Sequence, residues 1–153
     1  MKYMEIKEII LSVVRRAQKL KDTHTDEKGA PVNYACLFAQ TDDEWQEMND
    51  AVAATGSVIK ETPTGPLYLI QPLKTSAGVL KLIKVRKPDP TRTERGDADF
   101  TVADYPSFKS KALSLPGFSL IERPDFEMIE LMQKNVPVRA YFSHPPIDVE
   151  LGV

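Results

Sequence analysis

The chain has 153 residues and a net charge of −2, with 20 Lys and Arg against 22 Asp and Glu. This near-neutral balance excludes a general nucleic-acid binder, which needs a positive field, and no apolar run reaches the ~18 residues of a membrane span. Cys36 is the only cysteine, so an intramolecular disulfide is impossible. We therefore expect residues 1–153 to form a single soluble domain in the cytoplasm.

The first element is an amphipathic helix over residues 3–21. Apolar side chains recur there at helical spacing, and Glu5, Glu8, Arg15 and Arg16 make the segment too charged for a signal peptide. A polar stretch with Gly29 and Pro31 follows. Residues 1–30 are thus a leading helix and loop, whose apolar face should bury against the rest of the domain.

A first module is predicted for residues 31–88. It begins with a short buried strand at 34–39, and Thr41 and Glu44 then match a capping box, in which each side chain accepts the other's backbone N–H. The helix that follows ends near Gly56. Three strand candidates complete the module, at 57–62, 67–71 and 79–86.

The charged, proline-containing loop 87–96 is the internal boundary, and we interpret it as a solvated linker. The second module, residues 97–143, starts with a strand at 98–102 and a helix that Asp104 and Pro106 initiate. Residues 144–153 are predicted to be a tail. Three more strands are expected, at 118–122, 126–132 and 136–142.

The two modules echo each other in sequence as well as in element order. Residues 56–63 (GSVIKETP) parallel 117–124 (GFSLIERP), with Gly, Glu and Pro in register. Residues 67–71 and 128–132 then align at the same offset. The pattern indicates an internal repeat of one strand–helix–strand–strand–strand unit, written βαβββ.

Paired βαβββ modules resemble the glyoxalase/bleomycin-resistance/dioxygenase superfamily, also called vicinal oxygen chelate proteins. The leading helix before residues 33–37 (NYACL) further resembles its YecM-type branch. The resemblance implies an α+β fold with a cupped mixed or antiparallel sheet, helices on the convex side and a site on the concave side. It also implies that metal ligands, where present, are His or Glu on the first and fourth strands of each module.

Strand alternation indicates which side chains would face the concave side. Because Ala35, Leu37 and Ala39 suit the helix side, their neighbours are left for the cup. Mixed polar and aromatic side chains are typical of ligand pockets. We hypothesise that the protein binds a small, oxygen-rich or anionic molecule there, on Tyr34, Phe38, Lys84, Asp97, Asp99, Arg139 and Tyr141.

The expected metal ligands are replaced in this chain. The first-strand position holds Tyr34 or Cys36, and the candidates that remain are Asp97, Asp99 and Glu130. A catalytic divalent site needs about three protein ligands and an open position. The sequence therefore assigns no particular cofactor; a divalent metal belongs to the alternative function, a metal-dependent isomerase, lyase or dioxygenase.

Several residues have a structural interpretation beside the functional one. Asp97 and Asp99 are an acid–base pair or, as we favour, a strand start with Asp99 paired to Arg139 or Lys84. Arg139 and Tyr141 form an anion fork or belong to an exposed edge strand. Cys36 fits a small buried side chain better than a nucleophile.

A third hypothesis is an interaction module that docks a partner through the leading helix or loop 87–96. The sequence leaves open whether the chain is an enzyme, and whether it is a monomer or a homodimer.

Overall fold

The computed structural model describes residues 1–153 as one open, eight-stranded sheet with helices packed on it. Helix α1 (Tyr3–His24) comes first. The first module then consists of β1 (Val32–Phe38), α2 (Asp42–Ala53), β2 (Gly56–Thr62), β3 (Gly65–Thr75) and β4 (Gly78–Arg86). The second consists of β5 (Gly96–Phe100), α3 (Tyr105–Ala112), β6 (Phe118–Glu122), β7 (Glu127–Leu131) and β8 (Val138–His144).

The strand order is β2-β3-β4-β1-β5-β8-β7-β6. In each module the first strand pairs in parallel with the fourth, β1 with β4 and β5 with β8. The other pairs are antiparallel, and β1 and β5 join the modules at the centre of the sheet. Both modules are therefore wound in the same way, which confirms the predicted α+β architecture of two βαβββ units.

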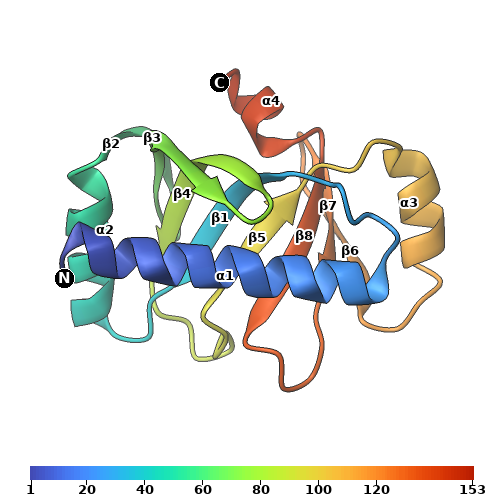
Figure 1. Cartoon of the computed structure of the whole chain (residues 1–153), viewed down its shortest axis with the longest axis horizontal. Coiled ribbons are helices and arrows are strands. Elements are labelled where there is room, and N and C mark those ends of the chain that lie inside the picture. The colour runs from blue at the N-terminus through green and yellow to red at the C-terminus, as the bar shows by residue number, and fades with distance from the viewer.

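Helix α1 runs across the strands on one face of the sheet, as Figure 1 shows, and none of its residues lines the cavity described below. Its face of Ile6, Ile10, Val13, Val14 and Ala17 is fully buried in the main hydrophobic core. Each such side chain contributes roughly 1.5–3 kcal/mol when it leaves water. The apolar face is thus used within the fold, which removes the leading helix as the basis of the docking hypothesis.

The helix extends one turn beyond its predicted end at residue 21. Lys21 is fully buried, and its Nζ donates to Asp22 Oδ1 at 2.6 Å and to the carbonyl of Glu27. Its own carbonyl accepts from the Thr25 N–H at 2.9 Å, so the chain continues to His24 before turning. No helix combines the length and the apolar run that crossing a lipid bilayer would require.

Strand β5 begins two residues earlier than predicted. A Cβ at Gly96 would lie 2.3 Å from the Cys36 carbonyl oxygen, so only glycine allows β5 to pair this closely with β1. The predicted strand 98–102 is shifted by two residues for this reason. The shift places Asp97 within the strand instead of directly before it.

Two further predictions need correction. The segment 144–153 is not only a tail: it contains α4 (Ile147–Leu151), which contacts β1 and ends at Gly152 with φ +72°. The capping box is half formed, because Thr41 Oγ1 accepts from the Glu44 N–H at 3.1 Å while the Glu44 carboxylate accepts from Gln40 instead. Arg95 holds that carboxylate away from Thr41.

Candidate functional site

Two rows of polar side chains cross the concave face where the modules meet. In the first row, Lys84 on β4 pairs with Cys36 on β1, which pairs with Asp97 on β5, which pairs with Arg139 on β8. The second row runs from Tyr34 through Asp99 and Tyr141 to Glu130. The register of the central strands therefore gathers residues that are up to about a hundred positions apart.

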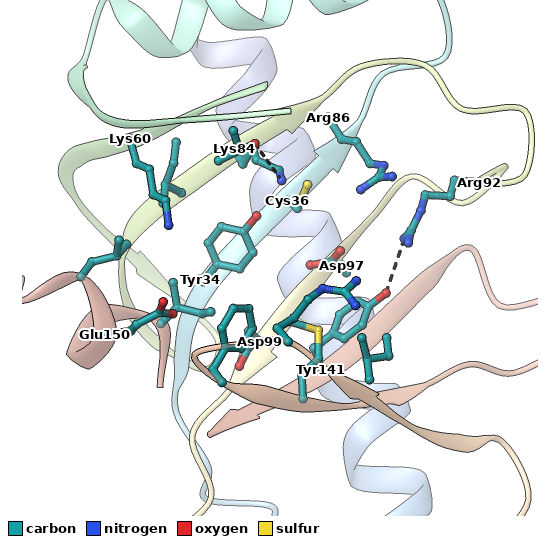
Figure 2. A pocket seen from close by; sticks show the side chains of 18 residues that line it. Tyr34, Cys36, Lys60, Lys84, Arg86, Arg92, Asp97, Asp99, Tyr141 and Glu150 are labelled. Carbon is teal, nitrogen blue, oxygen red and sulfur yellow. Dashed lines mark hydrogen bonds between the residues drawn. The ribbon is translucent and has the colours of Figure 1, made fainter. Parts of the chain in front are cut away.

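A cavity of about 260 Å³ lies over these rows. Its floor is formed by Tyr34, Cys36, Lys84, Asp97, Asp99 and Tyr141, as Figure 2 shows. Its apolar wall is formed by Ile121, Phe126 and Met128 from the β6–β7 hairpin and by Ile147 and Leu151 from α4. A polar floor within an apolar enclosure is the usual composition of a small-molecule site.

Five of the seven predicted ligand-binding residues thus line the cavity: Tyr34, Lys84, Asp97, Asp99 and Tyr141. Phe38 and Arg139 lie outside its lining. Their side chains are on the same side of the sheet, where the Arg139 guanidinium carbon lies 6.0 Å from the centroid of the Phe38 ring. The reason is that both are covered by the linker between the modules.

The cavity is lined by five cations, Lys60, Lys84, Arg86, Arg92 and Arg123, and by three acids, Asp97, Asp99 and Glu150. The whole chain has a net charge of −2, so this surplus of positive charge is local. Lys84, Arg86 and Arg92 are half-buried, whereas Lys60 and Arg123 are exposed at the rim. Positive charge inside a partly apolar enclosure attracts anions more strongly than it would on an open surface.

Arg92 shows that the loop 87–96 is more than the solvated linker we predicted. Its Nη1 donates to the Tyr141 hydroxyl at 3.4 Å, and its guanidinium carbon lies 5.3 Å from the centroid of the Phe38 ring. Figure 2 shows its side chain reaching toward the floor of the cavity. The linker therefore supplies one of the site's cations.

The three half-buried cations have few polar contacts within the chain, and all of them are long. Arg86 Nε is buried without a partner, and the nearest carboxylate oxygen, Asp89 Oδ2, lies 3.5 Å from Arg86 Nη2. Lys84 Nζ makes one long contact, 3.4 Å to Thr62 Oγ1, and burial lowers the pKa of Lys84. Arg86 and Arg92 thus share only loose ion pairs with Asp89, and Lys84 has no carboxylate oxygen within 4 Å.

Asp97 is the most isolated polar group on the floor. It is 6% exposed, no hydrogen bond reaches its carboxyl group, and its Oδ1 is enclosed without a partner. Burial, and then the nearby charge of Asp99, raise the pKa of Asp97 to about 7, against the opposing effect of Arg92, Lys84 and Arg139. Its charge therefore changes near neutral pH.

Asp99 is held quite differently. It accepts from the Ser143 N–H at 3.1 Å and from the Ser143 hydroxyl, and Asn33 Nδ2 lies 3.4 Å from Oδ1. The predicted pairing of Asp99 with Arg139 or Lys84 is therefore wrong. Burial raises the pKa of Asp99 to about 6, and the two bonds from Ser143 limit the rise.

Arg139 is engaged by carboxylates on both sides. Its Nε and Nη2 donate to Glu94 at 3.1 and 3.2 Å, and its Nη1 donates to Glu130 at 3.1 Å. The Tyr141 hydroxyl also donates to Glu130. Strand β8 lies between β5 and β7, so the interpretation of Arg139 and Tyr141 as an exposed edge strand is wrong.

The residues named for metal binding are not gathered into a site. Glu130 is occupied by Arg139 and Tyr141, and Asp99 by Ser143. No group of three or more His, Cys, Asp or Glu side chains is placed to hold a metal ion. Cys36 is buried on the floor, where burial raises the pKa of its thiol to about 12, so the thiol stays protonated.

Sequence reasoning missed three cations and an acid of the lining, Lys60, Arg92, Arg123 and Glu150, and favoured a solvated strand position over an anion site for Arg86. The density of basic residues after residue 81 was the one available signal, and we interpreted it as solvated. For α4 the signal was weaker still, because a five-residue helix has no periodicity to detect.

No family model matches the sequence, and no curated protein is similar to it. Among solved structures, the one described as "Structural Genomics, Protein EC4020" is similar with a TM-score of 0.74 and 11% identity, over 97% of this chain and 91% of that chain. A glyoxalase/bleomycin resistance protein/dioxygenase superfamily member from Vibrio splendidus 12B01 is similar with a TM-score of 0.44 and 12% identity, over 74% of this chain and 97% of that chain.

At 11% identity, the likeness to EC4020 concerns the fold alone. It extends over nearly the whole of both chains, so the leading helix, the two modules and their order belong to one shared architecture. Membership of the YecM-type branch stays a prediction. The paired modules give the chain the α+β fold of two βαβββ units that its internal repeat predicted.

Proposed function

We propose that the protein binds a small organic acid in the concave cavity, with the acid's carboxylate on Lys84, Arg86 and Arg92. The observation that carries this proposal is that these three half-buried cations have only long polar contacts within the chain, at 3.4 to 3.8 Å. Tyr34, Asp97, Asp99 and Tyr141, also proposed as ligand-binding residues, form the floor beneath the ligand.

The geometry favours an anion over a neutral ligand. Two guanidinium groups reach the same cavity from consecutive segments, Arg86 at the end of β4 and Arg92 in the linker. A guanidinium matches a carboxylate with two parallel hydrogen bonds, which are stronger than bonds between neutral groups. Asp89 forms ion pairs with both groups, but at 3.5 and 3.8 Å these pairs are longer than the hydrogen bonds that an incoming carboxylate would form.

The size and the wall of the cavity favour a small ligand with an apolar body. At about 260 Å³ the cavity lies just below the range of ~300–1,000 Å³ that is common for drug-sized ligands. Phe126, Met128 and Leu151 would cover the part of the ligand that points away from the floor. Acids with a short aliphatic or aromatic body fit this description.

The test is a thermal-shift screen with acetate, 4-methylpentanoate, phenylacetate and inorganic phosphate, followed by calorimetry. A ligand at ~100 times its dissociation constant stabilises the fold by ~2.7 kcal/mol, which is a shift of roughly 5–10 °C for a chain of this length. We expect 4-methylpentanoate or phenylacetate to give the largest shift.

Arg92→Gln should weaken that binding about tenfold or more, since it removes a charge-assisted bond. Arg16→Gln is the matched control, because Arg16 is exposed on α1, on the other side of the sheet. The proposal is wrong if none of the four anions stabilises the protein, or if Arg92→Gln and Lys84→Met bind the best of them as tightly as the wild type.

Cytoplasmic residence belongs to the same proposal, as the natural compartment for a chain whose one cysteine is a buried free thiol. A monomer or a homodimer is equally compatible with a site built within one chain.

A further inference from the structure

The proposed acid accounts for the cations but leaves Asp97 without a role. Asp97 lies on the cavity floor, and no side chain or backbone group forms a hydrogen bond with its carboxyl group. Buried carboxyl groups are nearly always hydrogen-bonded, because an unpaired one loses its hydration without a replacement. Asp99, two residues along the same strand, follows this rule through Ser143.

We infer that the ligand carries a hydroxyl group next to its carboxylate, and that this hydroxyl forms a hydrogen bond with Asp97; the protein is then a receptor for small hydroxy acids. The inference rests on the proposed function and names its ligand class. It assigns Asp97 to specificity, whereas Lys84, Arg86 and Arg92 supply attraction for any small anion.

A hydroxyl fits this position better than an ammonium group. The side chains that face Asp97 from the neighbouring elements include three cations, Lys84 on β4, Arg92 in the linker and Arg139 on β8. An ammonium group would be repelled by them. The remaining titratable groups that interact with Asp97 are Asp99 on its own strand, Tyr34 and Cys36 on β1, and Tyr141 on β8.

A hydroxyl also serves Asp97 in both of its protonation states. It donates to the ionised carboxylate and accepts from the neutral acid, whereas an ammonium group can only donate. The pKa of Asp97 near 7 makes both states relevant at neutral pH. Because the bond to the ionised form is charge-assisted and hence stronger, the preference for a hydroxyl should grow as pH rises.

The register explains why this carboxyl group and the cations act on one molecule. Asp97 pairs with Cys36, and Cys36 pairs with Lys84, so the carboxyl group and the ammonium group are two strands apart on one row. Strands are spaced by ~4.8 Å, which puts the two positions ~10 Å apart at the backbone. Side chains that converge over Cys36 can therefore contact adjacent groups of one small acid.

The experiment compares acids that differ only in the group beside the carboxylate. One series is phenylacetate, mandelate and phenylglycine; the other is 4-methylpentanoate, 2-hydroxy-4-methylpentanoate and leucine. Calorimetry near pH 8 should give at least about tenfold tighter binding of the hydroxy acid than of its unsubstituted partner. The amino acid should bind more weakly than the hydroxy acid.

Asp97→Ala should remove the preference, and near pH 8 it should bind phenylacetate or 4-methylpentanoate at least as tightly as the wild type, because the negative charge of Asp97 is gone. Asp97→Asn is the second variant, because an amide keeps the volume of the side chain. Its melting temperature shows whether the fold is intact. Equal affinity for the hydroxy acid and its unsubstituted partner, or a preference that survives Asp97→Ala, overturns the inference and leaves the proposed function standing. Tightest binding of the amino acid overturns the choice of a hydroxyl. Failure of every acid to bind overturns both proposals.

Discussion

Lys84 and Arg139 occupy the same place in the two modules, and yet they have different surroundings. Each lies on the fourth strand, in parallel register with a first-strand residue, Cys36 for Lys84 and Asp97 for Arg139. Arg139 is neutralised by Glu94 and Glu130, and its side chain is 8% exposed. Lys84 is half-buried and has one long contact.

The difference teaches where function can be sought in a duplicated fold. A cation that the protein has already satisfied with two carboxylates belongs to the structure, since a ligand would have to break those bonds. A cation left without a carboxylate partner destabilises the fold unless something else compensates for it. We therefore expect removal of Arg139 to lower stability more than binding, and removal of Lys84 to lower binding more than stability.

The largest effect on stability should come from replacing Arg139 by methionine, and Lys84→Met is the matching substitution in the first module. Arg139→Met would leave Glu94 and Glu130 as uncompensated, largely buried charges, and should lower the free energy of unfolding by about 3–5 kcal/mol. Lys84→Met should leave stability unchanged or raise it, because burial already disfavours its charged form, as its lowered pKa indicates. Urea unfolding of both variants measures this.

The same two variants should reverse their order in a binding assay. Lys84→Met should lose affinity for phenylacetate or 4-methylpentanoate, whereas Arg139→Met, below its unfolding midpoint, should retain most of it. If both variants lose stability to the same extent, the two positions are equivalent and the comparison fails.

The next effect concerns Asp97, the first-strand residue of the second module. Its folded-state pKa of about 7 lies above the ordinary value of 3.8. The folded protein therefore keeps this proton between roughly pH 4 and pH 7 while the unfolded chain has released it, so stability falls as pH rises through that window. Asp97→Asn is neutral throughout and should be more stable than the wild type near pH 8, by on the order of 4 kcal/mol.

Near pH 4 the wild type and Asp97→Asn should be equally stable, since both side chains are then neutral. Asp99 shifts in the same direction but is present in both proteins, so it cancels in the difference. Melting temperatures across this pH range decide the matter. A constant difference between the two proteins at all pH values would contradict the raised pKa.

Much of this fold could be predicted from sequence because its signals are periodic and repeated. Helix α1 carries a long apolar stripe, and the order of elements recurs after the linker. Alternation along β1 and β5 then assigned Tyr34, Asp97 and Asp99 to the concave side, where the structure has them. Periodicity is local, so a single sequence is sufficient to detect it.

The partners of these residues could not be predicted, because they depend on register between strands far apart in the chain. Glu130 reaches Arg139 and Tyr141 only once β7 and β8 are paired, and Ser143 reaches Asp99 only across β5 and β8. A shift of one residue in either pair would send these side chains to the other face. Arg92 lies in the linker and is not paired with any strand. Neither alternation nor register therefore predicts that its side chain points toward the cavity.

A smaller effect is expected on ligand affinity as pH changes. Ionisation of Asp97 places a negative charge beside Lys84 and Arg92, so the affinity for an unsubstituted acid such as phenylacetate should fall as pH rises from about 6 to about 8. A decrease of up to about tenfold corresponds to ~1.4 kcal/mol. Calorimetry at several pH values measures it.

Asp97→Asn serves as the reference for this pH series. Its affinity for phenylacetate should stay constant over the same range, because the amide does not titrate. An equally steep fall in the variant would assign the effect to another group, such as Asp99, whose pKa of about 6 lies at the lower end of the range.

The smallest effect is expected at the ion pair between the linker residue Arg95 and Glu44. It has good geometry, with distances of 2.6 and 3.0 Å, but its side chains are 31% and 24% exposed. Solvent competes for both charges, so Glu44→Gln should cost about 1 kcal/mol or less. Urea unfolding beside Arg139→Met gives the comparison under identical conditions.

Glu44→Gln isolates burial as the cause of the large effect predicted at Arg139. Both arginines form paired hydrogen bonds with a glutamate, and Arg95 and Glu94 are adjacent in the chain. If bonding geometry alone set the stabilisation, the two substitutions would have similar effects. A loss of several kcal/mol at Arg139 and a small loss at Glu44 would instead show that the enclosed network holds the second module's side of the cup. The cations on the first module's side, whose polar contacts are all long, then remain available to a ligand.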